Sequence, residues 1–212
     1  MSMKVIPFIY DDYDDLFANT YILVDDSLSC LVIDPSRKYE GIINYIEKSG
    51  LTLKGVLLTH GHFDHMRGVD LLIEKYRVPL YIGFYDEDCL KDPKKNLSYY
   101  MGMEMMVVNS PAITVSDKEI LHLLNEDIEV IYTPFHTIGC VCYYLKDSKI
   151  LFSGDTLFRF SIGRDDFPNS SPKDKRASLN KLMALPEDVK VYPGHGAFTK
   201  IGEERRNNPF VN

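Results

Sequence analysis

Three of the six histidines in the chain fall within six residues, in the sequence His60-Gly61-His62-Phe63-Asp64-His65. At the frequencies of His and Asp in this chain, such a spacing rarely arises by chance. Imidazole and carboxylate groups are the expected ligands of zinc, iron and manganese. The apolar run before the motif, residues 55–58, predicts a buried strand, which would deliver the cluster to a sheet edge where functional sites commonly lie. The motif therefore predicts a metal site.

The spacing within the motif favours two ions over one. A single turn of chain cannot direct all four of these side chains at one small ion. His60 and His62 are two positions apart, so their side chains can point to the same side and converge on one ion. Asp64 and His65 lie further along the turn and can face a second ion. Each ion then needs ligands from other parts of the chain.

Three further residues of ligand type repeat the arrangement of an apolar strand, turn residues and then a ligand. They are His136 after a predicted strand at 128–133, Asp155 after one at 150–153, and His195 after one at 189–192. Sites collect on loops at strand ends, so we expect these residues to join the cluster. His122, within an Ile-Leu-His-Leu-Leu run, follows no such pattern and is expected to be a core or edge histidine.

The hydrophobic pattern predicts the elements that position these residues. Further strands are expected at 5–10, 19–24, 29–33, 55–59, 78–82, 112–115 and 140–145. Helices are expected at 40–48, at 69–76 and from Ser171, as N-cap, to about residue 185. Strands interleaved with helices favour two packed sheets with helices outside, in one domain over residues 1–212. Residues 84–111, rich in Met and Tyr, fit either an adaptable pocket or an irregular core.

Composition limits the classes of function. The 212 residues are 45% hydrophobic and carry a net charge of −7, which argues against nucleic acid or an anionic membrane as the main partner. No apolar run approaches the ~20 residues of a membrane-spanning helix. The acidic N-terminal segment does not resemble a signal peptide, so we expect a cytoplasmic protein. The four cysteines fit free, buried thiols and no disulfide framework.

Four short motifs carry a resemblance to the metallo-β-lactamase superfamily. They are THGHFDH at 59–65, TPFHT at 133–137, SGDT at 153–156 and PGHG at 193–196, and their order matches that superfamily. The resemblance implies an αββα sandwich of two mixed sheets with a dinuclear metal site at their edge. It implies that His60, His62 and His136 hold the first ion, that Asp64, His65 and His195 hold the second, and that Asp155 bridges both.

Within the superfamily, the chain is most similar to single-domain bacterial proteins of the glyoxalase II (hydroxyacylglutathione hydrolase) group. FSGDTLF at 152–158, SIGRDDFPNSSP at 161–172 and IGEERRNNPF at 201–210 carry this likeness. The chain departs from the pattern at Asp165, where threonine is usual, and after Pro168, where no glycine follows. Only sixteen residues follow Gly196, so we expect no C-terminal glutathione-binding helical domain. Arg164, Tyr99 and Tyr100 are the candidate substrate contacts.

These features predict a dinuclear-metal hydrolase in which a metal-bridging hydroxide attacks a thioester carbonyl. The expected substrate is S-lactoylglutathione or a related hydroxyacyl thioester, and the expected cofactors are two divalent ions, zinc before iron or manganese. Asp64, orienting the water, and Asp155, bridging the ions, are the candidate catalytic residues. The sequence has no Gly-x-Ser-x-Gly elbow, and a thiolate leaving group with a pKa of about 8.5 needs little protonation.

The main alternative is a mononuclear iron persulfide dioxygenase of the same fold, which the sequence resembles almost as well. A flavodiiron-type protein usually has Glu at the position of His62, and a nuclease would show a basic surface. We expect a small-molecule thioester as the partner, with neither nucleic acid nor membrane. The sequence does not indicate an oligomeric state.

Overall fold

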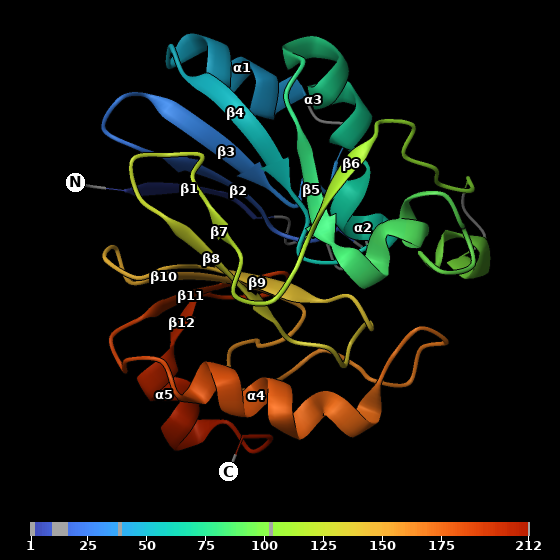
Figure 1. Cartoon of the computed structure of the whole chain (residues 1–212), viewed down its shortest axis with the longest axis vertical. Helices are drawn as coiled ribbons and strands as arrows, with labels where there is room; N and C mark the ends of the chain where they lie inside the picture. The colour runs from blue at the N-terminus through green and yellow to red at the C-terminus, as the bar shows by residue number, and fades with distance from the viewer. Residues whose placement is uncertain (1–2, 10–16, 38–39, 102–103, 212) are drawn as a thin grey trace.

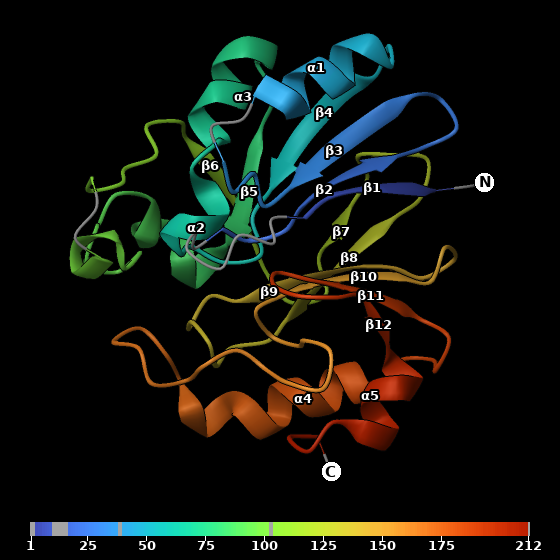
Figure 2. The same ribbon diagram turned by 180° about the vertical axis from the view of Figure 1, so that it is seen from behind.

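Two mixed β-sheets pack face to face with helices on both outer faces, in an αββα sandwich (Figures 1 and 2). The computed structural model describes residues 3–9, 17–37, 40–101 and 104–211. The first sheet has the strand order β1(Lys4–Phe8), β2(Thr20–Val24), β3(Ser29–Ile33), β4(Thr52–Leu57), β5(Leu80–Gly83) and β6(Ala112–Val115). Its first three strands are antiparallel, and β3 to β6 are parallel.

The second sheet is antiparallel except for one pair of strands. Its order is β12(Thr199–Lys200), β11(Lys190–Pro193), β10(Ile150–Gly154), β9(Val141–Leu145), β8(Ile128–Tyr132) and β7(Ile120–Leu121). Only β10 and β11 run parallel within the described part of this sheet. Because β9 is antiparallel to both β8 and β10, the carboxyl ends of β8, β10 and β11 reach the same edge.

Helices cover the outer face of each sheet. Helices α1(Glu40–Lys48) and α3(Val69–Tyr76) lie on the first sheet, and α4(Lys175–Met183) and α5(Ile201–Asn207) on the second (Figure 1). Between β5 and β6 the chain forms two 3₁₀ helices, η1(Phe84–Leu90) and η2(Ser98–Met101). Among the described residues, no helix is long and apolar enough to cross a membrane.

The strand β2 shows why the apolar runs of this chain form sheets buried on both faces. Tyr21 and Leu23 belong to the core between the sheets, while Ile22 and Val24 belong to the core beneath α1 and α3. All five residues of the strand are buried. A strand with both faces covered needs apolar residues at successive positions, as the sequence TYILV provides.

Most element bounds agree with the sequence predictions, and the differences have local causes. The predicted strand at 5–10 ends at Phe8, and Tyr10 lies outside the described residues. The helix expected from Ser171 begins as a 3₁₀ turn, η3(Pro172–Asp174). Ser171 is the N-cap of this turn, as predicted, although its hydroxyl donates to the Asp174 carboxylate and not to a backbone N–H. The charged segment at 201–207, for which the sequence predicted no helix, forms α5 and packs against α4 and β12.

Candidate metal centre

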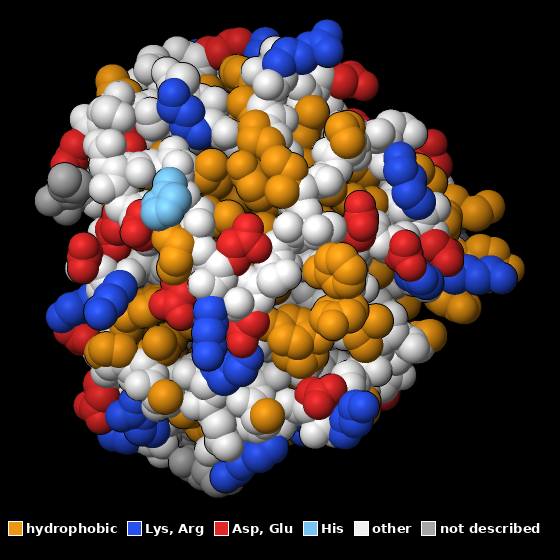
Figure 3. Space-filling view, in the orientation of Figure 1, with side chains coloured by type: hydrophobic (Ala, Val, Ile, Leu, Met, Phe, Trp, Pro, Cys, Tyr) orange, Lys and Arg blue, Asp and Glu red, His pale blue; other side chains and the backbone are white. Residues whose placement is uncertain are grey.

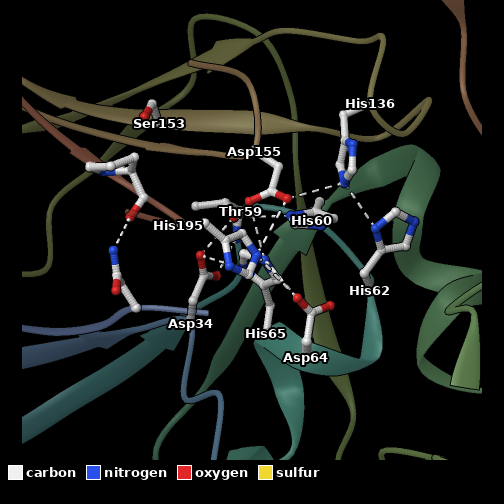
Figure 4. A network of polar contacts seen from close by, with 12 residues as sticks. Asp34, Thr59, His60, His62, Asp64, His65, His136, Ser153, Asp155 and His195 are labelled. Carbon is white, nitrogen blue, oxygen red and sulfur yellow. Dashed lines mark hydrogen bonds and ion pairs between the residues drawn. The ribbon is translucent and has the colours of Figure 1, made fainter. Parts of the chain in front are cut away.

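The seven side chains that the sequence predicts as metal ligands converge at the edge between the two sheets (Figure 4). They come from four segments that each follow a strand. After β4, the loop supplies His60 and His62, and the helix α2(Phe63–Met66) that follows supplies Asp64 and His65. The loops after β8, β10 and β11 supply His136, Asp155 and His195. The strand ends therefore bring together residues that are up to 135 positions apart.

The first group of ligand atoms comes from His60, His62 and His136, which offer atoms within 4.8 Å of one another. His136 Nε2 lies 3.0 Å from His62 Nδ1. On its other side, His136 Nδ1 donates to the carbonyl oxygen of Arg164 at 2.7 Å. A carbonyl oxygen can only accept, so the Nδ1 atom carries the proton and the Nε2 lone pair is directed into the cluster.

The second group comes from Asp64, His65 and His195, whose ligand atoms meet the same 4.8 Å limit. Asp64 Oδ2 lies 3.2 Å from His195 Nε2 and 3.7 Å from His65 Nε2. His65 is fully buried, and its Nδ1 atom lies 2.9 Å from Asp34 Oδ2. The Asp34 carboxylate thus orients the His65 ring so that Nε2 faces the cluster.

Asp155 lies between the two groups. Its Oδ1 atom is 3.3 Å from His65 Nε2, and its Oδ2 atom is 3.4 Å from His136 Nε2 and 3.6 Å from His195 Nε2. A third set of convergent ligand atoms, from His60, His65 and Asp155, links the two groups. One carboxylate therefore reaches both groups, which is the position that a bridging ligand would need.

The unpartnered atoms of this cluster indicate that divalent cations fit it. His60 Nε2, His65 Nε2 and Asp155 Oδ1 are buried and have no hydrogen-bond partner among the described residues. Each buried polar atom without a partner costs about 1–3 kcal/mol. All three atoms point into the cluster, where a cation would serve them together. Imidazole nitrogens with carboxylate oxygens suit zinc, iron or manganese.

The protonation states also suit metal binding. Burial lowers the pKa of His60 well below its usual value and, with the neighbouring His136, lowers the pKa of His62 to about 3, so both imidazoles are neutral at pH 7. Burial alone would raise the pKa of Asp64, but His65 and His195 lower it to about 2. The same two histidines hold the pKa of Asp155 well below its usual range. Both carboxylates are therefore charged.

His65 and His195 show the opposite shift. Burial acts to lower the pKa of both rings, but nearby carboxylates overcome it. The largest opposing cause is Asp34 for His65 and Asp155 for His195. The concentrated negative charge thus attracts protons to these rings in the metal-free protein, as it would attract a divalent cation.

Asp34 is a supporting residue that sequence reasoning missed. Its Oδ1 atom accepts a hydrogen bond from Thr59 N at 2.8 Å, and its Oδ2 atom accepts one from Thr59 Oγ1 at 2.7 Å in addition to the contact with His65. Its φ of +50° lies in the left-handed region, which Asp tolerates better than most residues. Its place directly after β3, where a buried strand ends in a carboxylate, was a signal that could have found it.

Asp86 is a second missed residue, and it ties together the two loops that carry the first group. Its buried carboxylate accepts hydrogen bonds from Gly61 N at 2.9 Å, Gly139 N at 2.9 Å and Thr137 Oγ1 at 2.6 Å. Burial raises the pKa of Asp86, although these hydrogen bonds oppose the shift. Asp86 lies in the irregular stretch 84–111, where no sequence pattern marks it as buried.

Two glycines permit the close packing of the centre. A Cβ atom at Gly61 would lie 2.3 Å from Cys89 Cβ, and one at Gly194 would lie 2.2 Å from Asp155 Oδ1. Neither position has space for a side chain. Gly61 of the HGH motif and Gly194, the first glycine of PGHG, are therefore required by contacts to the residues in and around the ligand cluster.

The structure does not bring the predicted substrate contacts into the cluster. The Arg164 guanidinium is exposed, bonds to Asp166 at 2.9 Å and stacks over the Phe167 ring. Tyr99 and Tyr100 are both more than half exposed, on η2. His122 is also exposed and its Nδ1 atom lies 2.6 Å from Asp127 Oδ1. Of the two predicted positions, core or edge, it takes the edge, directly after the edge strand β7. All four cysteines are free and buried, as predicted.

Comparison with known proteins identifies the family. The model of the metallo-beta-lactamase superfamily matches residues 13–195, and the chain belongs to this superfamily. The chain is 36% identical over 197 residues to the probable metallo-hydrolase YqgX of Bacillus subtilis, with 92% of each chain covered. It is 33% identical over 196 residues to the hydroxyacylglutathione hydrolase GloC of Haemophilus influenzae, again with 92% of each covered.

Solved structures agree with this assignment. The B3 metallo-beta-lactamase BLEG-1 superposes with a TM-score of 0.90 at 34% identity and covers 99% of both chains. The protein TTHA1623, in a di-iron-bound form, superposes with a TM-score of 0.85 at 32% identity, covering 97% of this chain and 99% of its own. The chain is thus a metal-dependent hydrolase of the metallo-beta-lactamase fold.

Proposed function

We propose that the chain is a dinuclear-metal hydrolase that cleaves thioesters, with S-lactoylglutathione or a related hydroxyacyl thioester as its substrate. The observation that carries the proposal is the pair of three-residue ligand groups joined by the Asp155 carboxylate. His60, His62 and His136 would hold one ion, Asp64, His65 and His195 the other, and Asp155 both. Two bound divalent ions, zinc before iron or manganese, would supply the acidity that ionises water near neutral pH and polarises a carbonyl.

Asp64 is the residue best placed to orient the attacking water. Its pKa of about 2 keeps the carboxylate charged at neutral pH. Its Oδ2 atom lies 3.2 Å from His195 Nε2, while its side chain keeps some exposure to solvent, unlike the fully buried His65. The carboxylate can therefore accept a hydrogen bond from water that enters the cluster.

The chain offers no thiol for a covalent route. Burial raises the pKa of Cys30 to about 12 and that of Cys142 to about 11. Burial also raises the pKa of Cys89 and Cys140. None of the four is a thiolate at neutral pH, and the thiolate is the nucleophilic form. Direct attack by water on the thioester remains the favoured route.

The choice of a thioester is supported by the relative GloC, whose name assigns it a hydroxyacylglutathione substrate. Because the chain is similar to the metallo-beta-lactamase BLEG-1, a β-lactam is the alternative substrate that must be tested beside the thioester. The Arg164 guanidinium is exposed and already paired with Asp166, so we expect it to contribute little to the binding of the substrate. We therefore expect a KM for S-lactoylglutathione above the low end of the usual ~1 μM to 1 mM range.

The test is steady-state kinetics on protein loaded separately with zinc and with iron. S-Lactoylglutathione, a chromogenic β-lactam and glutathione persulfide would be compared, with oxygen uptake followed for the last. We expect the thioester to have the highest kcat/KM. A higher value for the β-lactam would contradict the thioester assignment. One iron per chain with persulfide-dependent oxygen uptake would instead support the dioxygenase.

A further inference from the structure

A cavity of about 540 Å³ lies beside the metal centre, between η1, η2 and the loop at Pro168 and Asn169. Its walls include Phe84, Tyr85, Tyr100 and Ile138. Pockets that hold small molecules usually measure about 300–1,000 Å³ and have mostly apolar walls with a few polar groups. The cavity has the size and the lining of such a pocket, and no role in the centre described above.

Asn169 connects this cavity to the metal centre. Its Oδ1 atom lies 3.4 Å from His62 Nε2, while His62 Nδ1 faces His136 Nε2 at 3.0 Å. One imidazole ring therefore has the ligand cluster on one side and a wall of the cavity on the other. The wall of the cavity at Asn169 therefore lies directly beside one of the proposed metal ligands.

The cavity walls favour an apolar occupant. Phe84, Tyr85 and Tyr100 are 55%, 56% and 57% exposed, and Ile138 is 42% exposed. Exposed aromatic side chains gathered in one hollow mark binding surfaces more often than scattered ones do. Figure 3 shows hydrophobic side chains on the side of the molecule where η1 and η2 lie, with both signs of charge among them.

The charges at the rim do not favour a polyanion. Lys95 pairs with Asp88 at 2.8 Å, and Lys94 lies over the Tyr99 ring at 5.3 Å. Glu87 adds a second acid to the lining, so two lysines face two acids. These charges cancel, and a phosphate-bearing group would gain little from them. An aryl ring would bury apolar surface against the aromatic walls.

We propose that this cavity is a substrate subsite that binds an apolar, preferentially aromatic, group of the thioester. This inference rests on the proposed function, because it takes the metal centre as the place of cleavage. The aryl group can belong to the acyl part or to the thiol part of the substrate, and the cavity recognises the same chemistry in both. The side chain of Asn169 forms the wall between the subsite and His62.

The test compares aryl and small substrates in variants of the cavity wall. Two pairs of substrates are compared. S-Mandeloylglutathione and S-lactoylglutathione differ by an aryl group in the acyl part, and S-benzyl thioacetate and S-methyl thioacetate differ by an aryl group in the thiol part. Phe84→Ala and Tyr100→Ala remove exposed walls, and Phe210→Ala is the matched control, since this exposed ring lies outside the cavity. Metal content is measured for every variant.

We expect the wild-type protein to prefer the aryl member of at least one pair, by kcat/KM, and both wall variants to reduce that preference about tenfold. Phe210→Ala should keep it. The pair that shows the effect identifies the side of the substrate that carries the group. An absent preference in the wild type, or one that survives both wall variants, overturns the subsite.

A binding measurement separates the failure of this inference from failure of the proposed function. S-Benzylglutathione and S-methylglutathione are thioethers, which the enzyme cannot hydrolyse, and their affinities are measured by calorimetry. Tighter binding of the benzyl compound, lost in Phe84→Ala and Tyr100→Ala, supports the subsite even if no thioester is cleaved. Equal binding of the two compounds, together with hydrolysis lacking an aryl preference, contradicts the subsite and leaves the hydrolase standing.

Discussion

The substitution Asp34→Asn tests how the structure fixes the ligand state of His65. Asp34 is buried and accepts hydrogen bonds from Thr59 N, Thr59 Oγ1 and His65 Nδ1 at 2.8, 2.7 and 2.9 Å. An asparagine keeps the shape but has one oxygen and one NH₂ group, and it cannot accept at all three donors. If its oxygen stays with Thr59 N, its NH₂ group faces His65 Nδ1.

The expected effect is a shift of the His65 proton to the ligand atom. His65 Nδ1 would then have to accept, so the proton would move to Nε2, which faces Asp155 Oδ1 at 3.3 Å. A protonated nitrogen cannot bind a metal ion. Loss of such an orienting partner typically costs 10–100-fold in metal affinity, or about 1.4–2.7 kcal/mol. The ion at Asp64, His65 and His195 should weaken by that factor, and the ion at His60, His62 and His136 by much less.

The assay is a competition titration of zinc against a chelator, fitted for two sites. Asp25→Asn is the control, because Asp25 is also buried and also accepts backbone hydrogen bonds, from Ser27 and Ser29, in the turn between β2 and β3. Circular dichroism would confirm that both variants fold. Unchanged affinity in Asp34→Asn would refute the reasoning, as would an equal loss in Asp25→Asn, which would indicate general destabilisation.

Three further predictions concern the ligands themselves. Asp155→Asn should remove most turnover and lower the occupancy of at least one ion while the fold is kept, and full activity would disprove the bridging role. His62→Gln should lose metal, whereas His122→Gln should not, because His122 is exposed and pairs with Asp127 away from the cluster. Equal losses in both variants would mean that the histidines are wrongly divided between ligands and non-ligands. Lowering the pH from about 8 to about 6 should release the ion at His65 and His195 first, since protons compete earliest where the pKa is raised, whereas the pKa of His62 is about 3. Metal retained after dialysis at each pH measures this order, and earlier loss of the His62 ion would contradict it.

The layered fold could be predicted because its strands are buried on one or both faces and leave a clear apolar pattern. The strand at 29–33 and the helix at 40–48 were predicted with the bounds that the structure has. Short edge strands such as β7 and β12, of two residues each, carry too little pattern to be seen. The helix α5 was missed because its sequence, IGEERRN, is mostly charged and buries few side chains.

The ligand cluster could be predicted because histidines are few in this chain and five of the six, with two aspartates, follow predicted strands. Asp34 also follows a strand, β3, but nothing else in the sequence marks it, and Asp86 lies in an irregular stretch. Asp34 and Asp86 are ordinary acids in the sequence, and their roles depend on donors 25 to 53 residues away. Roles set by contacts between distant segments are visible only in the folded chain.

The number of metal ions that the active protein needs tests the central claim most directly. Metal-free protein would be titrated with zinc while bound metal and S-lactoylglutathione hydrolysis are measured on the same samples. The ligand geometry predicts that two ions bind per chain and that activity rises until the second site is filled. Binding that saturates at one ion with full activity, or hydrolysis by the metal-free chain, would contradict the dinuclear assignment.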